Sequence, residues 1–97
     1  MPQFVQTPEQ KALIESLVNE LPVYRKKLRM SQADLGEAVG KSRQKISEME
    51  RGVAPLGWDT YLAIILVLGS RGALEIKGRD GDRLAATGKL IGGKIRF

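Results

Sequence analysis

Apolar positions recur every three or four residues along the chain up to Gly69, which is the spacing of amphipathic helices. The first stretch begins with TPEQ, in which Thr7 is a suitable N-cap and Gln10 completes a capping box. Its apolar stripe comprises Leu13, Ile14, Leu17, Val18 and Leu21. Pro22 interrupts the pattern, because proline lacks the N–H that an interior helical position needs. We therefore expect a break or bend near residues 19–22.

Two short helices follow, each opened by a serine and closed by a glycine. Ser31 caps the first, with Asp34 three positions later as its acidic partner, and Gly40 ends it in a left-handed conformation. Ser42 caps the second, which ends at Gly52. Two short helices joined by a turn of this length have the spacing of a helix-turn-helix.

The second of these helices is unusually polar, with only Ile46 and Met49 to hold it to the body of the domain. Arg43 and Gln44 in its first turn can form paired hydrogen bonds with base edges, arginine with guanine and glutamine with adenine. The start of a helix also offers unpaired backbone N–H groups that suit phosphate. This turn favours a helix that enters the major groove of DNA. The alternative is a solvated face with pairs four residues apart.

A strongly apolar helix is predicted from Trp58 to Leu68, closed by Gly69. Beyond it, glycine and charged residues dominate. Residues 73–77 alternate between apolar and polar and predict a strand, with Leu74 and Ile76 on one face. Residues 90–97 fit a second strand or a disordered tail. The expected fold class is mainly α: a compact helix-turn-helix bundle of four to five helices, with a short C-terminal β-strand that pairs in a dimer.

Composition excludes several classes of site. The 97 residues suffice for one domain, and they include neither cysteine nor histidine. Disulfides, the usual zinc sites and imidazole or thiolate catalysis are therefore excluded, and we expect no cofactor and no enzyme activity. The N-terminus lacks a secretory signal, and the longest apolar run, residues 61–68, is too short to cross a bilayer. These features predict a cytoplasmic protein without a membrane partner.

The net charge of +5 is unevenly distributed. Residues 21–57 and 70–97 each carry a net charge of +4, whereas residues 1–20 and 58–69 are net acidic. Two basic blocks indicate a polyanionic partner. The side chains expected to supply affinity independent of sequence are Arg25, Lys26, Lys27, Lys45 and Arg51. A merely solvated basic surface is the alternative for residues 25–27.

Residues 31–52, SQADLGEAVGKSRQKISEMERG, closely resemble the Cro/lambda-repressor-like (XRE-type) helix-turn-helix family. The shared pattern has Ser-Gln, Leu, Gly, Ser-Arg-Gln, Ile-Ser and Glu-Arg-Gly at these offsets. The match extends upstream to Tyr24 and downstream to Gly69, so that it covers about half of the chain. The resemblance implies a transcriptional repressor that binds double-stranded operator DNA as a homodimer.

The resemblance also implies roles for single residues. Base contacts fall to Arg43, Gln44 and Glu48. Phosphate contacts fall to Gln32, Ser42, Lys45 and Arg51. Gln32 would in addition brace the recognition helix. Two residues depart from the family pattern. Lys41 replaces a usual apolar residue, which predicts a looser turn, and Gly36 replaces a common alanine, which costs helix propensity but keeps a close helix contact.

The layout divides into an N-terminal helix (1–20), a DNA-binding domain (21–69) and a strand with a basic tail (70–97). A helix-turn-helix followed by a strand resembles the HipB-like antitoxins, which implies a kinase-like toxin as a further partner and a strand that pairs through Leu74 and Ile76. Three alternatives stay open. The tail could simply add basic charge, the chain could be a phage repressor or restriction-modification controller, or it could be a protein-interaction module without specific DNA readout.

Overall fold

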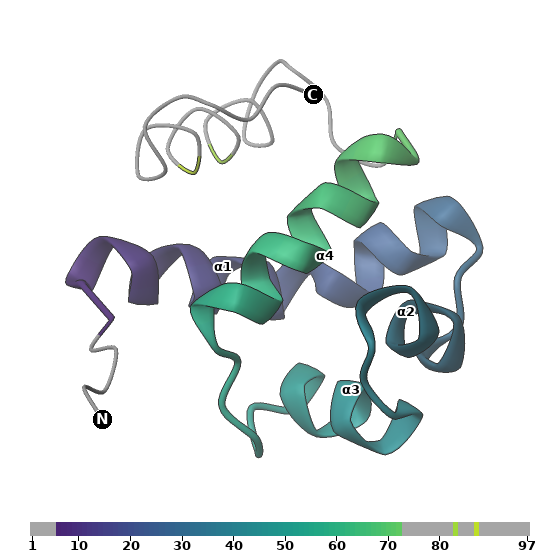
Figure 1. The fold of residues 1–97 in the computed structure, drawn as a ribbon, viewed down its shortest axis with the longest axis horizontal. Coiled ribbons are helices and arrows are strands. Elements are labelled where there is room, and N and C mark those ends of the chain that lie inside the picture. The colour runs from purple at the N-terminus through teal and green to yellow at the C-terminus, as the bar shows by residue number, and fades with distance from the viewer. Residues whose placement is uncertain (1–5, 73–82, 84–86, 88–97) are drawn as a thin grey trace.

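The computed structural model describes residues 6–72 together with Arg83 and Thr87. The described residues form four helices: α1 (Pro8–Leu28), α2 (Gln32–Val39), α3 (Arg43–Glu50) and α4 (Trp58–Ser70). Helix α4 crosses α1, and α2 and α3 lie next to each other below this crossing in the view of Figure 1. The mainly helical fold is confirmed, and the described residues contain no strand.

Helix α1 is longer than its sequence suggested. The predicted capping box is confirmed, with Thr7 Oγ1 accepting from the N–H of Gln10 at 3.1 Å and Gln10 Oε1 accepting from that of Thr7 at 2.9 Å. The predicted break near residues 19–22 is wrong, because Pro22 lies inside one continuous helix. Proline removes one hydrogen bond, while buried residues on both sides of it, Leu21 and Tyr24 among them, hold the two halves on one core.

The caps of α2 and α3 are confirmed. Ser31 closes a capping box with Asp34, and Gly40 ends α2 in the left-handed region at φ 75°. Ser42 Oγ accepts from the N–H of Lys45 at the start of α3. The predicted helix from Trp58 to Leu68 ends two residues too early, because α4 runs to Ser70 and the left-handed glycine after it is Gly72, at φ 80°.

One apolar core joins all four helices. Leu17 and Leu21 of α1, Leu35 of α2, Ile46 of α3 and Ile64 of α4 are all completely buried. The aliphatic stripe read from the sequence of α1 is thus the face that packs inward, with Ile14, Leu17 and Leu21 buried and the two others packed against the cluster. The core fixes one face of α3 and leaves the other outside.

The predicted strand at residues 73–77, with Leu74 and Ile76, lies outside the described residues, as do the turn at residues 79–82 and the segment 90–97. Arg83 and Thr87 are described. Both have helical backbone and both are buried, at 4% and 1% exposure. Arg83 is therefore part of the folded domain, and its charge does not contribute to the exposed basic tail that the sequence predicted.

Candidate nucleic-acid interface

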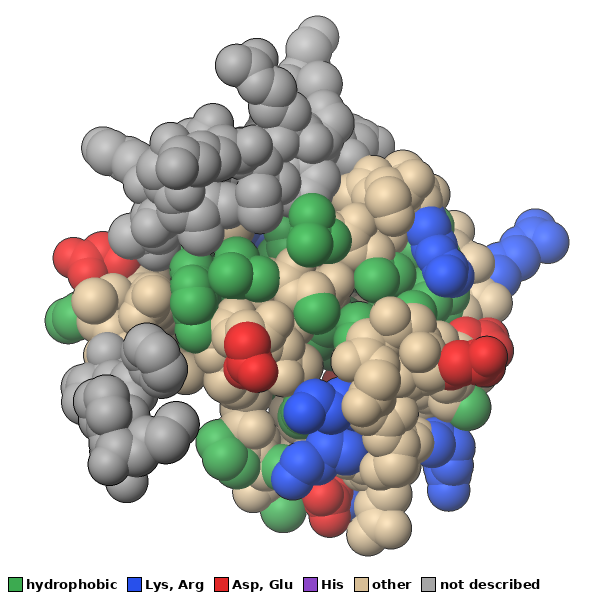
Figure 2. All heavy atoms as spheres, viewed as in Figure 1, with side chains coloured by type: hydrophobic (Ala, Val, Ile, Leu, Met, Phe, Trp, Pro, Cys, Tyr) green, Lys and Arg blue, Asp and Glu red, His purple; other side chains and the backbone are tan. Residues whose placement is uncertain are grey.

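Helix α3 is anchored along one side only. Ile46 and Met49 are 0% and 3% exposed, and they face the core. Arg43, Gln44 and Lys45 in the first turn are all exposed. Since these three residues precede Ile46 directly, the core contact holds the helix while its polar first turn stays open to a partner. Lys and Arg side chains gather over this part of the molecule in Figure 2.

The turn between α2 and α3 is tight. The N–H groups of Gly40 and Lys41 both donate to the carbonyl of Gly36, the latter at 2.7 Å. A Cβ atom at position 36 would lie 2.4 Å from the carbonyl oxygen of Lys41. The close helix contact expected at Gly36 is confirmed. The backbone at Lys41 is held by this hydrogen bond while its side chain is exposed, so the looser packing expected from that side chain stays a prediction.

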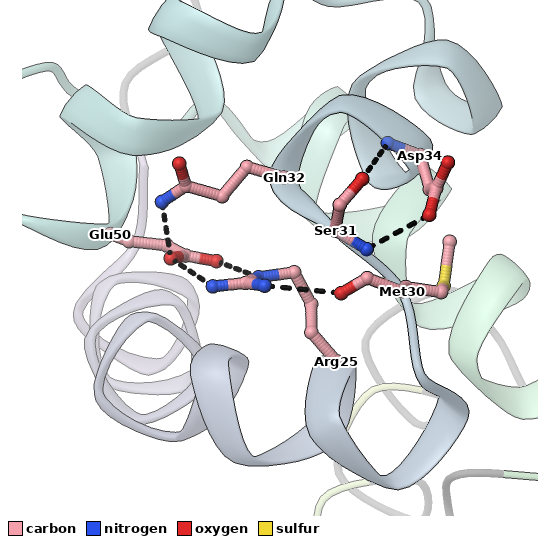
Figure 3. A network of polar contacts seen from close by, with 6 residues as sticks. All are labelled: Arg25, Met30, Ser31, Gln32, Asp34 and Glu50. Atoms are coloured by element: carbon pink, nitrogen blue, oxygen red, sulfur yellow. Dashed lines mark hydrogen bonds and ion pairs between the residues drawn. The ribbon is translucent and has the colours of Figure 1, made fainter.

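The last residue of α3 is held by an ion pair that crosses to α1. Arg25 donates from Nε to Glu50 Oε2 at 2.6 Å and from Nη2 to Oε1 at 2.8 Å, and its Nη1 donates to the carbonyl of Met30 at 3.1 Å (Figure 3). The two side chains are only 15% and 6% exposed. Their hydrogen bonds raise the pKa of Arg25 further above its ordinary value. A two-pronged pair of this kind fixes direction as well as distance.

This pair changes the interpretation of Arg25, which the sequence placed among the cations that attract DNA. Its guanidinium is committed to Glu50 and to the end of α1, so Arg25 serves to place α3. Sequence reasoning matched both residues to the family pattern but did not pair them, because they stand 25 positions apart. One feature of the sequence could have suggested the pair: Arg25 and Glu50 carry opposite charges, and both belong to the stretch that resembles the family.

Gln32 joins the same network from the first turn of α2. Its Nε2 donates to Glu50 Oε1 at 3.0 Å, which is the bracing contact that the resemblance implied. Glu50 therefore receives hydrogen bonds from α1 and from α2 at once. The phosphate contact assigned to Gln32 stays a prediction.

The remaining candidate residues lie along the accessible side of α3 and its flanks. Ser42 and Arg51 are exposed at its two ends, and Glu48 is half-buried between them. Ser42 Oγ accepts a backbone hydrogen bond from Lys45, which leaves its hydroxyl hydrogen available to a phosphate oxygen. Arg43, Gln44 and Lys45 stand in the same turn as the free N–H groups of the helix start. This is an arrangement of donors suited to an anionic, base-bearing polymer.

Comparison with known proteins agrees with this geometry. A family model described as a helix-turn-helix domain matches residues 16–75, which is more than half of the chain and includes all four helices in whole or in part. Searches of curated proteins and of solved structures returned no match. Among the helices of the described part, none is long and apolar enough to cross a membrane.

Proposed function

Because the chain belongs to the helix-turn-helix domain family, a DNA-binding family, we propose that it is a sequence-specific transcriptional repressor acting as a homodimer on a pseudo-palindromic operator. The observation that carries this proposal is the contrast within α3 between a buried anchoring face and an exposed first turn of Arg43, Gln44 and Lys45. The exposed side chains are the types that read base edges and phosphates. The proposed role goes with the cytoplasmic location expected from the sequence.

In this proposal α3 enters the major groove. Arg43, Gln44 and Glu48 read base edges. The phosphates on either side are held by Gln32, Ser42, Lys45 and Arg51. Phosphate contacts set the register of the helix on the duplex, and base contacts then select the sequence. The Arg25–Glu50 pair keeps the helix at a fixed angle to the rest of the domain.

The decisive experiment is selection of bound duplexes from a random-sequence pool. The expected product is an enriched motif with two related half-sites about one helical turn apart. Binding to the enriched duplex and to a scrambled version is then compared at several salt concentrations. The logarithm of affinity should fall steeply with the logarithm of salt, by roughly 0.9 per phosphate neutralised. Equal affinity for both duplexes would reduce the protein to a nonspecific binder, and no salt dependence would remove DNA as its partner.

The homodimer is proposed to form by antiparallel pairing of residues 73–77, with Leu74 and Ile76 packed against apolar side chains of α4. Truncation after residue 72 would also remove Arg83 and Thr87 from the core, so a point variant gives the cleaner test. Ile76→Pro removes one N–H and the strand geometry together. Sedimentation equilibrium should show a weaker dimer than for Ile76→Val, its matched control. An unchanged dimer would place the interface on the helices.

The antitoxin role rests on the layout of the C-terminal segment alone. It predicts a kinase-like partner encoded beside this chain. Coexpression with the neighbouring reading frame, followed by copurification, tests it. If the chain copurifies with such a partner yet shows no preference for any duplex, the protein-interaction module without DNA readout becomes the better description.

A further inference from the structure

Arg83 lies against α1 in a way that its sequence gives no hint of. Its Nη1 donates to the carbonyl of Leu13 at 3.2 Å, and its Nη2 donates to Ser16 Oγ at 2.9 Å and to Glu20 Oε2 at 2.7 Å. The guanidinium carbon also lies 5.9 Å from the centre of the Tyr24 ring. The side chain is 3% exposed and that of Glu20 is 18% exposed. A charge this deeply buried is retained only where its partners are held in place.

Thr87 makes the corresponding contact on α4. Its Oγ1 and the hydroxyl of Tyr61 are 2.7 Å apart, and both residues are buried. Arg83 and Thr87 are four residues apart, and each has helical backbone. Arg83 contacts α1 and Thr87 contacts α4. The two residues thus bridge two helices that the connecting turns do not join directly, and we refer to this pair of contacts as the clasp.

The two helices joined by the clasp support α3 in different ways: α1 contacts α3 directly, whereas α4 packs against α2, which in turn packs against α3. On α1, Tyr24 donates to the same Glu20 Oε2 that accepts from Arg83, and the next residue is Arg25, which grips Glu50. On α4, the ring of Tyr61 is stacked on Trp58 at 4.7 Å, and Trp58 is the first residue after the loop that follows α3. The clasp is thus connected to α3 on the α1 side through Glu20, Tyr24 and Arg25, and on the other side through α4.

The clasp is not accessible from the surface of the molecule. Arg83 and Thr87 are 4% and 1% exposed, and their hydrogen bonds reach α1 and α4. They therefore cannot touch a duplex that α3 occupies. Any influence that they have on DNA binding must pass through α1 and α4.

We propose that the clasp of Arg83 and Thr87 holds α1 and α4 in the arrangement that places α3 for DNA, so that release of the C-terminal segment weakens specific binding. The inference rests on the proposed DNA-binding function. Arg83 and Thr87 are positioning residues in this scheme. Coupling between two sites is reciprocal, so bound operator DNA also tightens the clasp.

The test compares Arg83→Ala with Lys11→Ala, which removes the same charge from an exposed position on α1. Both variants are titrated with the duplex enriched by the wild-type protein and with its scrambled version. We expect Arg83→Ala to lose about tenfold in affinity for the enriched duplex, within the range of changes that act at a distance. Its loss on scrambled DNA should equal that of Lys11→Ala, and Arg83→Lys should recover part of the difference.

Two further readouts separate positioning from plain loss of stability. Trp58 is the one tryptophan of the chain, and its stacking on Tyr61 makes its fluorescence a reporter of the clasp. Thr87→Val keeps the shape of the side chain and removes the hydroxyl, so it should shift the Trp58 emission while far-ultraviolet circular dichroism stays unchanged. In the wild-type protein, the enriched duplex should slow amide hydrogen exchange at residues 83–87, although no DNA reaches them.

The outcomes divide cleanly. If the wild-type protein prefers no duplex, the proposed function fails. If it prefers one, and folded Arg83→Ala binds that duplex as well as Lys11→Ala does, the clasp has no role in DNA binding and the inference is overturned. If Arg83→Ala does not fold, Thr87→Val carries the same comparison, with a matched loss of affinity supporting the inference and an unchanged affinity refuting it.

Discussion

Helices α2 and α3 are the same length and begin in the same way, yet their first turns are built for different purposes. Each has eight residues and a serine N-cap whose oxygen accepts from the N–H three residues on. In α2 that third residue is Asp34, whose carboxylate accepts in return from the N–H of Ser31 at 2.9 Å. In α3 it is Lys45, and the first turn contains no acid. In α2 the carboxylate of Asp34 offsets the positive N-terminal end of the helix dipole. In α3 no acid does so, and that end could interact with an anionic ligand.

The difference lies in the charge of the first turn and in its effect on the stability of the helix start. A carboxylate in the first turn interacts favourably with the helix dipole and satisfies a donor that would otherwise lack a partner. Lysine at the same position does neither, and it adds positive charge to an end that is already positive. Helix α3 gives up local stability at its start and is held instead at its far end, where Glu50 meets Arg25 and Gln32.

Breaking that far end should have the largest effect on stability. Glu50→Ala leaves Arg25 without its partner in a half-buried position, and we expect the free energy of unfolding to fall by about 3 kcal/mol. Urea unfolding measures it. Glu48→Ala is the matched control, because it removes from the same helix a carboxylate that forms no ion pair with any residue the structure describes, and it should change stability by less than about 0.5 kcal/mol. Similar losses in both variants would show that the ion pair does not hold α3.

Giving α3 the capping box of α2 should make the domain more stable and weaken its binding to DNA. Lys45→Glu completes the capping box with Ser42 and should stabilise the domain by roughly 0.5 kcal/mol. In the proposed complex the same change would place a negative charge beside a phosphate, and we expect a loss in DNA affinity of about a hundredfold, or about 2.7 kcal/mol. Lys45→Ala should lose less and flatten the salt dependence by about one phosphate contact. A Lys45→Glu protein that binds DNA normally would exclude this turn from the interface.

Truncating the two side chains proposed to contact base edges should affect binding and leave stability unchanged. Arg43→Ala and Gln44→Ala should each cost about 1–3 kcal/mol in affinity for the enriched duplex. Both residues are exposed, so the melting temperature should hardly change. Binding isotherms on enriched and scrambled duplexes distinguish contacts to base edges from contacts to phosphates. Equal losses on both would assign the two side chains to phosphates.

The tight turn between the two helices offers a test in which two effects oppose each other. In an open helix, Gly36→Ala would stabilise by up to about 1 kcal/mol. Here the added methyl group meets the carbonyl oxygen of Lys41, and overpacking of this kind costs roughly 1–3 kcal/mol. We expect a net loss of about 1 kcal/mol by urea unfolding. Ala33→Gly, an exposed control in α2, shows the ordinary cost of glycine there, and a gain from Gly36→Ala would contradict the observed contact.

The smallest effect is expected from the acid that closes the start of α2. Hydrogen bonds from the backbone and side chain of Ser31 lower the pKa of Asp34 below its ordinary value. The resulting stabilisation is complete above the unfolded pKa of about 3.9 and is lost as the pH falls through the lower folded value. Asp34→Asn should remove this part of the decline in the urea midpoint below about pH 4. Identical pH profiles would show that the cap is not linked to stability.

Local rules accounted for much of this domain. The caps at Thr7, Ser31 and Ser42 were predictable because their partners stand three residues away, within reach of one helical turn. The exposed face of α3 was predictable because so few of its residues are apolar. Pro22 was misjudged, since the sequence shows the lost hydrogen bond but not the core that offsets it.

The remaining features depend on contacts between residues far apart in the chain. Arg25 reaches Glu50 across 25 positions, and Arg83 reaches Glu20 across 63. Nothing in the composition around Arg83 separates it from the other basic residues of a glycine-rich segment. Only the fold brings it to a carboxylate, a hydroxyl and a carbonyl at once. Charge counted along the sequence therefore overstates the charge available to DNA.

In the proposed complex with DNA, the length of α3 limits how many base pairs one copy of the domain can contact. Eight residues span roughly 12 Å, about the width of the major groove, which brings three or four base pairs within reach. A given word of four base pairs occurs by chance roughly once in 256 positions, whereas a genome presents about a million or more competing sites. In the proposed homodimer, two copies at a fixed separation would make a chance match far rarer, so the distance between the two α3 helices would itself help to select the site.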